Sequence, residues 1–186
     1  MAEIKELRPP LSNESLRDLK IGDKVSITGV VYSARDAAHK RLVELIERGE
    51  DLPFDVSGQI IYYVGPTPAK PGYAVGSAGP TTSSRMDSYA PLLIEKGLKG
   101  MIGKGPRSEG VKQAMREHGA VYLAAVGGAG AMISKSIVKS EVIAYPELGA
   151  EAIRRMEVRG FPAIVAIDML GNDLYQQGKE AYRVGA

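Results

Sequence analysis

The chain has 186 residues, of which 44% are hydrophobic and 25% are charged, and its formal net charge is +2. This length and composition predict one soluble globular domain over residues 1–186 with a sizeable hydrophobic core. The weak net charge, the scattered cations and the absence of Trp exclude a typical nucleic-acid-binding surface, and no apolar run approaches the ~20 residues that a membrane span needs.

The sequence also lacks targeting and redox signals. Residues 1–6 contain no apolar signal-peptide core, which predicts a cytoplasmic protein. The sequence contains no cysteine, so the chain forms no disulfide and cannot bind an iron–sulfur cluster through thiolates.

The N-terminal part of the chain predicts an arm, a short helical turn and a strand. Residues 1–13 form an extended arm, because Pro9-Pro10 prevents an early helix. Ser15 and Asp18 have the spacing of a capping box for a helical turn. Lys24–Tyr32 alternates polar and apolar residues and then becomes continuously apolar, as expected of a strand that enters the core.

A helix is predicted to begin after Arg35. Its buried stripe is expected to consist of Leu42, Leu45 and Ile46, with His39 on the polar face. Arg35 lies at the junction between the preceding strand and this helix. Because the helix dipole disfavours a cation at a helix start, the position indicates a role for Arg35 outside the helix.

The remaining elements alternate between strands and helices, which predicts an α/β fold with a mixed central sheet flanked by helices. A proline-rich, stiff loop is expected at Gly65–Gly72, and a turn at Gly171–Asp173 leads into a helical C-terminal tail that includes residues 176–186. Further strands are predicted at Gln59–Val64, Ala120–Val126, Ile137–Tyr145 and Ala163–Ile167, and a short helix at Ala150–Arg154.

Two glycine-rich segments, Gly76–Asp87 and Gly100–Ser108, carry the most informative chemistry, because such backbone can approach a ligand closely. A small dianion needs a planar guanidinium, an ammonium and short hydrogen-bond donors. The segments offer this combination at Thr81, Thr82, Ser83, Ser84, Arg85, Lys104 and Arg107. The alternative is a surface loop followed by an ordinary strand end, since Gly, Pro and Ser dominate turns.

Each glycine-rich segment is followed by a predicted helix. Asp87-Ser88 is expected to cap a helix that ends at Gly97, and Ser108 a helix that ends at Gly119. Both segments would then lie at helix N-termini, where anions are favoured. Nucleotide binding is disfavoured, because Leu98 stands where a P-loop requires its first glycine.

Several blocks in sequence order resemble one known family: Gly65–Ala69, Gly76–Asp87, Met101–Gly105, Gly119–Tyr122, Gly127–Gly130 and Gly171–Tyr175. They are similar to the β subunit of class I, iron–sulfur-dependent fumarate hydratase and to the related β subunit of L(+)-tartrate dehydratase. The resemblance covers nearly the whole chain. It implies a swivelling β/β/α fold and a hydro-lyase subunit that takes part in the reversible hydration of fumarate to L-malate.

The resemblance also implies roles for particular residues. Arg35, with the following Asp36-Ala-Ala-His39, matches an arginine that binds a substrate carboxylate. Thr81 matches a threonine that removes a proton, although it could instead only hydrogen-bond a carboxylate. By residue type, Arg35, Arg85 and Lys104 suit the binding of a C4 dicarboxylate and the stabilisation of charge that develops on it. Lys104 is also expected to lower the pKa of the Thr81 hydroxyl.

The family carries a 4Fe–4S cluster whose open iron holds the departing hydroxyl. Because this chain lacks cysteine, the resemblance implies that the cluster belongs to a separate α subunit, in an α2β2 heterotetramer that is inactive without that subunit. An exposed apolar patch on this chain is expected to mark the interface with that subunit.

Two alternatives remain open at this point. The first is dehydration of L(+)-tartrate, whose two carboxylates would be held by the same cations. The second is a non-catalytic carrier or binding module, because swivelling domains also occur as phosphohistidine carriers. Such carriers need an exposed histidine on a loop, whereas His39 and His118 are both predicted to lie in helices.

Overall fold

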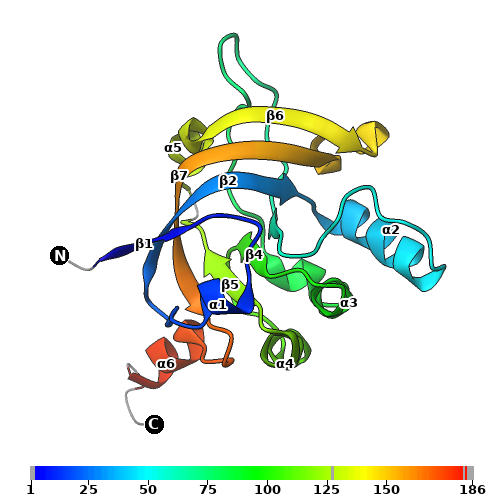
Figure 1. Ribbon diagram of the computed structural model, residues 1–186. Coiled ribbons are helices and arrows are strands. Elements are labelled where there is room, and N and C mark those ends of the chain that lie inside the picture. The colour runs from blue at the N-terminus through cyan, green and yellow to red at the C-terminus, as the bar shows by residue number, and fades with distance from the viewer. Residues whose placement is uncertain (1–2, 127, 182, 184–186) are drawn as a thin grey trace.

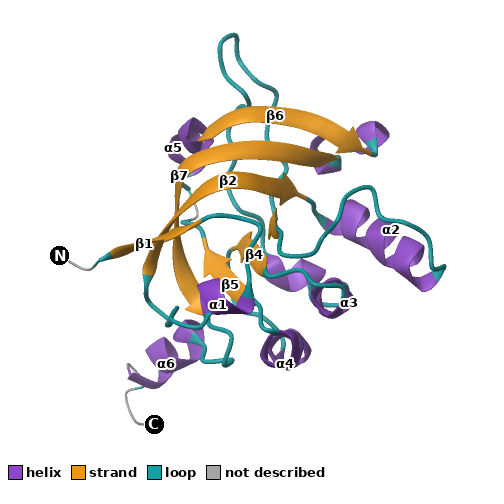
Figure 2. Ribbon diagram, in the orientation of Figure 1, coloured by secondary structure: helices purple, strands orange, loops and turns teal. Residues whose placement is uncertain are grey.

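The computed structural model describes residues 3–126, 128–181 and 183, and within them the strands form one mixed sheet (Figures 1 and 2). The strands are β1 (Ile4–Leu7), β2 (Lys24–Ser33), β3 (Ile60–Tyr62), β4 (Gly100–Gly103), β5 (Val121–Ala124), β6 (Ile137–Ala144) and β7 (Ile153–Ile167). The helices are α1 (Asn13–Leu16), α2 (Asp36–Glu47), α3 (Ala90–Glu95), α4 (Glu109–His118), α5 (Gly130–Ile133) and α6 (Leu174–Ala181). The 3₁₀ turns are η1 (Ser83–Met86), η2 (Ser134–Ser136) and η3 (Pro146–Glu151). The predicted α/β class with a mixed sheet is confirmed.

Strands β2, β3, β4, β5 and β7 close into a ring. Strands β1 to β5 run parallel to one another in sequence order. The long strand β7 runs antiparallel to β2 along one edge and antiparallel to β5 along the other, so that Ile164 pairs with both Lys24 and Ala124. Since β2 also pairs with β3, strands β2, β3, β4, β5 and β7 form a ring, and β6 extends the sheet beyond β7.

The short strands β3 and β4 of the ring are buried on both faces. In β3, Ile60 and Tyr62 belong to the cluster of apolar side chains inside the ring, whereas Ile61 belongs to a second cluster outside it. This arrangement explains why the strand is a continuous apolar run instead of an alternating one. The second cluster lies under α2, α3 and α4, which lie together on one flank of the sheet (Figure 1).

Several of the predicted elements form as the sequence indicated, among them β3, β5, β6 and α2. The strand predicted over Lys24–Tyr32 is β2, which is one residue longer. The helix predicted after Ser108 is α4: the Ser108 side chain accepts a hydrogen bond from the N–H of Val111, and Gly119 ends the helix in the left-handed region at φ 68°. None of the described helices is long and apolar enough to cross a membrane.

The first residues differ from the prediction in their pairing. Residues 1–2 of the predicted arm lie outside the described residues, but Ile4–Leu7 is a parallel strand on β2. The capping box of α1 is formed by Ser12 and Ser15, not by Ser15 and Asp18. The expected helical turn therefore exists but begins three residues earlier, because Ser12 provides the N-cap hydroxyl.

The strand predicted over Ala163–Ile167 is the end of the much longer β7, and a 3₁₀ turn, η3, precedes it in place of the helix predicted over Ala150–Arg154. Charged residues in the first half of β7 hid the strand from the sequence pattern. In the folded chain Arg155 lies opposite Glu141 of β6 and on its other side opposite Tyr32 of β2, so tertiary pairing overrides the local pattern.

Candidate active site

The carboxyl ends of β2, β3 and β4 meet at one edge of the sheet, because these neighbouring strands are parallel. Arg35 follows the end of β2. The N–H of Thr81 donates to the carbonyl of Tyr63, the residue after β3, at 2.8 Å. Lys104 follows the last residue of β4 directly. Ligands of α/β proteins commonly bind at the carboxyl ends of parallel strands, and three of the predicted site residues are brought to this edge.

The two glycine-rich segments are joined to one another by backbone hydrogen bonds. The N–H of Lys104 donates to the carbonyl of Thr81 at 3.3 Å, and the N–H of Ser83 donates to the carbonyl of Lys104 at 2.9 Å. Thr82 and Lys104 form an isolated parallel bridge. The main chains of Thr81 and Lys104 are thus held next to each other. The sequence suggested a shared site for these two residues only through their residue types.

Arg85 reaches the same edge through Asp36, the first residue of α2. Its Nε donates to Asp36 Oδ1 at 2.7 Å, while Asp36 Oδ2 lies 3.7 Å from Nε of Arg35. Glu151 provides a second carboxylate, with Oε1 3.8 Å from Arg35 Nη2. The side chains of Arg35 and Arg85 remain 22% and 48% exposed, so both side chains keep surface that a ligand can contact.

Gly65 lets Arg35 lie against the end of β3. A Cβ atom at Gly65 would stand 2.8 Å from Arg35 Nη1 and 3.1 Å from the carbonyl oxygen of Ala150, so a side chain there would push the Arg35 guanidinium out of its place. The carbonyl of Tyr63, two residues earlier, holds Thr81. The Arg35 side chain therefore packs beside the peptide segment that positions Thr81.

The balance of charge at this edge is positive. Arg35, Arg85 and Lys104 stand against Asp36 and Glu151, which leaves one unit of positive charge. Lys104 is exposed and takes part in none of the ion pairs formed within the described part of the chain. An exposed ammonium beside two partly neutralised guanidinium groups is an attractive site for a carboxylate. Asp36 could have been suspected from its place beside Arg35, but nothing in the sequence links Glu151 to this edge.

Arg107, which the sequence offered as a further cation for the ligand, is not available. It is 6% exposed, its Nε donates to Asp87 Oδ1 at 2.6 Å, and its guanidinium lies over the rings of Tyr63 and Tyr122. A buried arginine must be paired with a carboxylate to offset its desolvation. Arg107 is therefore part of the support beneath the site.

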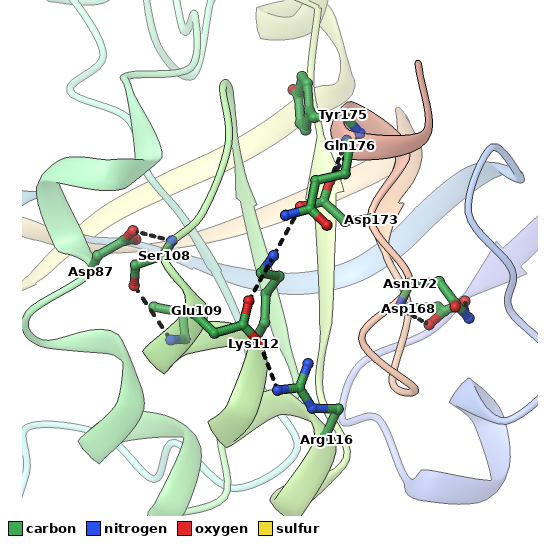
Figure 3. A network of polar contacts seen from close by, with 11 residues as sticks. Asp87, Ser108, Glu109, Lys112, Arg116, Asp168, Asn172, Asp173, Tyr175 and Gln176 are labelled. Atoms are coloured by element: carbon green, nitrogen blue, oxygen red, sulfur yellow. Dashed lines mark hydrogen bonds and ion pairs between the residues drawn. The ribbon is translucent and has the colours of Figure 1, made fainter. Parts of the chain in front are cut away.

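The same ion pair explains why the predicted helix cap at Asp87-Ser88 is wrong. Asp87 Oδ2 accepts from the N–H of Ser108 at 2.6 Å, and so Asp87 holds the residue that caps α4 (Figure 3). Helix α3 begins at Ala90 after Tyr89 and has no side-chain cap. Only the Lys104 segment leads directly into a capped α-helix, whereas Thr81 leads into the 3₁₀ turn η1.

His39 was predicted to lie on the polar face of α2, but it is fully buried. Its Nδ1 lies 2.9 Å from the carbonyl oxygen of Arg35, and its ring meets the ring of Tyr63 edge-on. Burial lowers the pKa of His39 to about 4, although the contact with the Arg35 carbonyl acts in the opposite direction. A neutral ring with a proton on Nδ1 fits this contact. A buried ring cannot receive a phosphoryl group from a partner, which disfavours the carrier alternative for His39.

The buried neutral His39 should make stability depend on pH. Because its pKa is about 4 in the folded chain and 6.5 in its unperturbed form, the unfolded state binds the proton first as the pH falls. The contribution is complete above about pH 6.5 and is lost towards pH 4. Between pH 7.5 and pH 5 it amounts to about 2 kcal/mol.

Urea unfolding at the two pH values checks this expectation. The free energy of unfolding should fall by about 2 kcal/mol more in the wild type than in His39→Gln, where the titrating group is missing. The matched control His118→Gln leaves His39 in place and should show the wild-type dependence. Equal pH dependence in wild type and His39→Gln would contradict the assignment.

Gly103 is a second position near the site where neighbouring side chains leave no room for a Cβ atom. A Cβ atom at Gly103 would stand 1.9 Å from Ser83 Oγ and 3.0 Å from Cδ2 of Tyr63. Ser83 is itself buried and hydrogen-bonded to Tyr122 at 2.8 Å, so it cannot move away freely. Gly103→Ala is therefore expected to lower the free energy of unfolding by about 1–3 kcal/mol.

The control for Gly103→Ala is Gly110→Ala in α4. Gly110 lies in a helix and its nearest neighbour, Ser108 Oγ, is 4.0 Å from the added Cβ. This substitution should stabilise the chain by about 0.5–1 kcal/mol, because alanine costs less conformational entropy in a helix. Urea unfolding of the three proteins gives the comparison, and equal midpoints for Gly103→Ala and wild type would show that the close approach is not real.

The residues at this edge do not form a metal site. The sequence contains no cysteine, and no group of three His, Asp or Glu side chains in the described residues could hold a metal ion. The groups that gather at the edge are cations, a hydroxyl and the carboxylates of Asp36 and Glu151, and none of them is the thiolate that typically binds an iron–sulfur cluster. The chain's own donor set therefore does not fit such a cluster.

The fold and this edge define an α/β domain with a wall of guanidinium, ammonium and hydroxyl groups suited to small anions. The chain belongs to the family described as "Fumarase C-terminus", whose model matches residues 2–178.

Three curated relatives illustrate the range of the family. The chain is 44% identical over 164 residues to "Fumarate hydratase class I, anaerobic" of Escherichia coli and 39% identical over 176 residues to "Fumarate hydratase 2" of Leishmania major. The matches cover 87% and 92% of this chain, but it spans only 30% and 31% of those relatives. It is 36% identical over 179 residues to "Putative L(+)-tartrate dehydratase subunit beta" of Methanocaldococcus jannaschii, with 92% of both chains covered.

Proposed function

We propose that this chain is the β subunit of a two-subunit hydro-lyase that catalyses the reversible hydration of fumarate to L-malate. The observation that carries the proposal is the convergence of Arg35, Thr81, Arg85 and Lys104 at one edge of the sheet, in a chain of the fumarase C-terminus family. In this proposal the chain supplies one wall of the active site, and it is inactive without a partner.

The proposed substrate is a C4 dicarboxylate, which has one carboxylate at each end. Arg35 and Arg85 are held about Asp36 from opposite sides, and their guanidinium groups suit planar, bidentate contact with a carboxylate. Lys104 adds a compact charge from the adjacent segment. Ligand binding would replace Asp36 and Glu151 as the nearest anions, so these two carboxylates serve to hold the arginines in place before the substrate arrives.

The proposed chemistry on this wall is the movement of a proton. Its removal from the carbon beside a carboxylate drives negative charge onto that carboxylate, and preorganised cations stabilise such charge most effectively. The main chains of Lys104 and Thr81 are hydrogen-bonded to each other, and we propose that the Lys104 ammonium favours the ionised form of the Thr81 hydroxyl. We assign Thr81 as the base and Lys104 as the group that stabilises both charges. The alternative, in which Thr81 only donates a hydrogen bond, is tested below.

We further propose that the partner is an α subunit, that the α chain carries the 4Fe–4S cluster, and that the two chains form an α2β2 assembly. We also propose that this chain has the swivelling β/β/α fold of the family and that the enzyme is cytoplasmic. A relative of matching length is named a β subunit. The chain also has an apolar hollow of about 330 Å³ that none of the four site residues lines. This hollow supports the proposal that a partner binds there. Three of its large apolar side chains are more than 60% exposed: Ile4, Val126 and Met132.

The second candidate substrate is L(+)-tartrate, and one observation favours it. The relative that matches this chain over 92% of both lengths carries tartrate dehydratase in its name, whereas the fumarate hydratases are longer proteins. Assay of the reconstituted pair of subunits with L-malate and L-tartrate, each as the only substrate, decides between them. We expect a higher kcat/KM for L-malate, and a clear preference for tartrate would reverse the assignment.

A further inference from the structure

Both hydrogen-bonding groups of the Gly105 peptide backbone are held by tyrosine hydroxyls. The Gly105 N–H donates to Tyr175 Oη at 3.2 Å, and Tyr122 Oη donates to the Gly105 carbonyl at 2.9 Å. Gly105 has φ 83°, in the left-handed region that glycine adopts without strain. The residue directly after Lys104 is thus fixed from two sides by side chains that come from distant parts of the sequence.

Tyr122 connects Gly105 with the other glycine-rich segment. It belongs to β5, is fully buried, and its Oη also lies 2.8 Å from Ser83 Oγ. Because a phenol has a single proton, which is used on the Gly105 carbonyl, the Ser83 hydroxyl donates to Tyr122. Ser83 lies two residues from both Thr81 and Arg85. One phenol oxygen therefore bridges the two segments that carry the proposed site.

Tyr175 connects Gly105 with the C-terminal segment. Its own N–H donates to Asp173 Oδ1 at 2.9 Å, and Asp173 lies 3.5 Å from Lys112 Nζ of α4 (Figure 3). Lys112 and Asp173 are 4% and 5% exposed, and Glu109 gives Lys112 a second carboxylate at 3.0 Å. A buried and doubly paired lysine holds this anchor firmly, so the start of α6 is fixed relative to α4.

We propose that the hydroxyls of Tyr122 and Tyr175 are positioning groups that set the place of the Lys104 ammonium relative to Thr81 and Arg85. The inference rests on the proposed function. The two rings would fill the same space without their hydroxyls, so packing does not require the oxygens at Gly105. The hydroxyls fix the peptide that follows Lys104, and a small displacement of a catalytic cation is costly for the reaction.

The test compares Tyr122→Phe and Tyr175→Phe in the assembled enzyme, each with and without Lys104→Met. Each Phe variant is expected to lower kcat/KM about tenfold when Lys104 is present, and less than about twofold when it is absent, because the effect acts through Lys104. A purely structural role would lower activity equally in both backgrounds, and that result would overturn the proposal.

Tyr62→Phe is the matched control, since the Tyr62 hydroxyl is also buried and donates to a backbone carbonyl, that of Ala78. Its effect should be the same in both Lys104 backgrounds.

A second readout does not depend on activity. In the full chain alone, Tyr175→Phe should increase hydrogen exchange at the Gly105 amide at least tenfold, measured by NMR, while the amide of Leu123 in β5 keeps its protection. Unchanged exchange at the Gly105 amide would overturn the proposed positioning role of Tyr175, even if the assembled enzyme were active. If the reconstituted wild-type subunits were inactive but Gly105 exchange were faster in Tyr175→Phe, the proposed function would be refuted. The contact of the Tyr175 hydroxyl with the Gly105 peptide would remain supported.

Discussion

Replacement of Thr81 by valine is expected to lower kcat of the assembled enzyme by about 10²–10⁴-fold with little change in KM. The valine side chain has the shape of threonine without the hydroxyl, so substrate contacts and packing are retained while the proposed base is lost. The backbone contacts of Thr81 with Tyr63 and Lys104 do not involve the side chain, and they should hold the variant in place. Steady-state kinetics with L-malate measure the effect.

Thr81→Ser is the matched control, because it keeps the hydroxyl and should retain most of kcat. If Thr81→Val kept nearly full kcat and raised only KM, the threonine would be a hydrogen-bond donor to a substrate carboxylate and the assignment as base would be wrong.

Replacement of Lys104 by methionine is expected to lower kcat by about 10²–10³-fold, which corresponds to about 3 kcal/mol of lost transition-state stabilisation. Methionine keeps most of the length of the side chain and removes the charge. Lys104 is exposed at the carboxyl end of β4, so the fold should tolerate the change. The loss should appear in kcat because the stabilised charge develops only as the proton leaves.

The control for Lys104→Met is Lys96→Met. Lys96 is also exposed, but it precedes β4 and therefore lies at the opposite edge of the sheet. The same loss of charge there should leave kcat within about twofold, because solvent screens charges that are separated by more than about 10 Å. Equal losses in the two variants would show that Lys104 acts through net charge and not through its place in the site.

Local sequence signals predicted the elements that depend on local interactions. The Ser108 cap and the Gly119 end of α4 follow from hydrogen bonds and φ angles within a few residues. The place of Arg35 at the junction of β2 and α2 also follows from the strand pattern before it. These features position one cation of the site, so part of the site was predictable without any knowledge of distant contacts.

Interactions between distant residues were the ones that local reasoning missed. Asp87 had the right type and place for a helix cap, but the buried Arg107, 20 residues later, takes its carboxylate. His39 lies among polar neighbours in the sequence, yet it faces Tyr63 across the interior. Arg107 pairs with a carboxylate of another segment, and the His39 ring packs against a ring that follows β3; the sequence pattern records neither contact.

The closed ring of strands was also beyond the sequence pattern. A mixed sheet followed from the alternation of elements, but the pairing of β7 with both β2 and β5 depends on contacts more than 100 residues and about 40 residues apart along the chain. The resemblance of the motifs to a known family, in contrast, correctly placed the chain among the fumarase C-terminus proteins. The roles of Arg35, Thr81, Arg85 and Lys104 stay predictions.

The central claim is that this chain provides one half of an active site that a second polypeptide completes. It is tested most directly by titration of the purified chain with a purified α subunit that carries its 4Fe–4S cluster, while the rate of fumarate formation from L-malate is recorded. We expect no turnover by either chain alone and a rate that rises with added β chain until it saturates at a fixed molar ratio. Turnover by the isolated chain, or a rate of the α subunit that does not change when this chain is added, would contradict the claim.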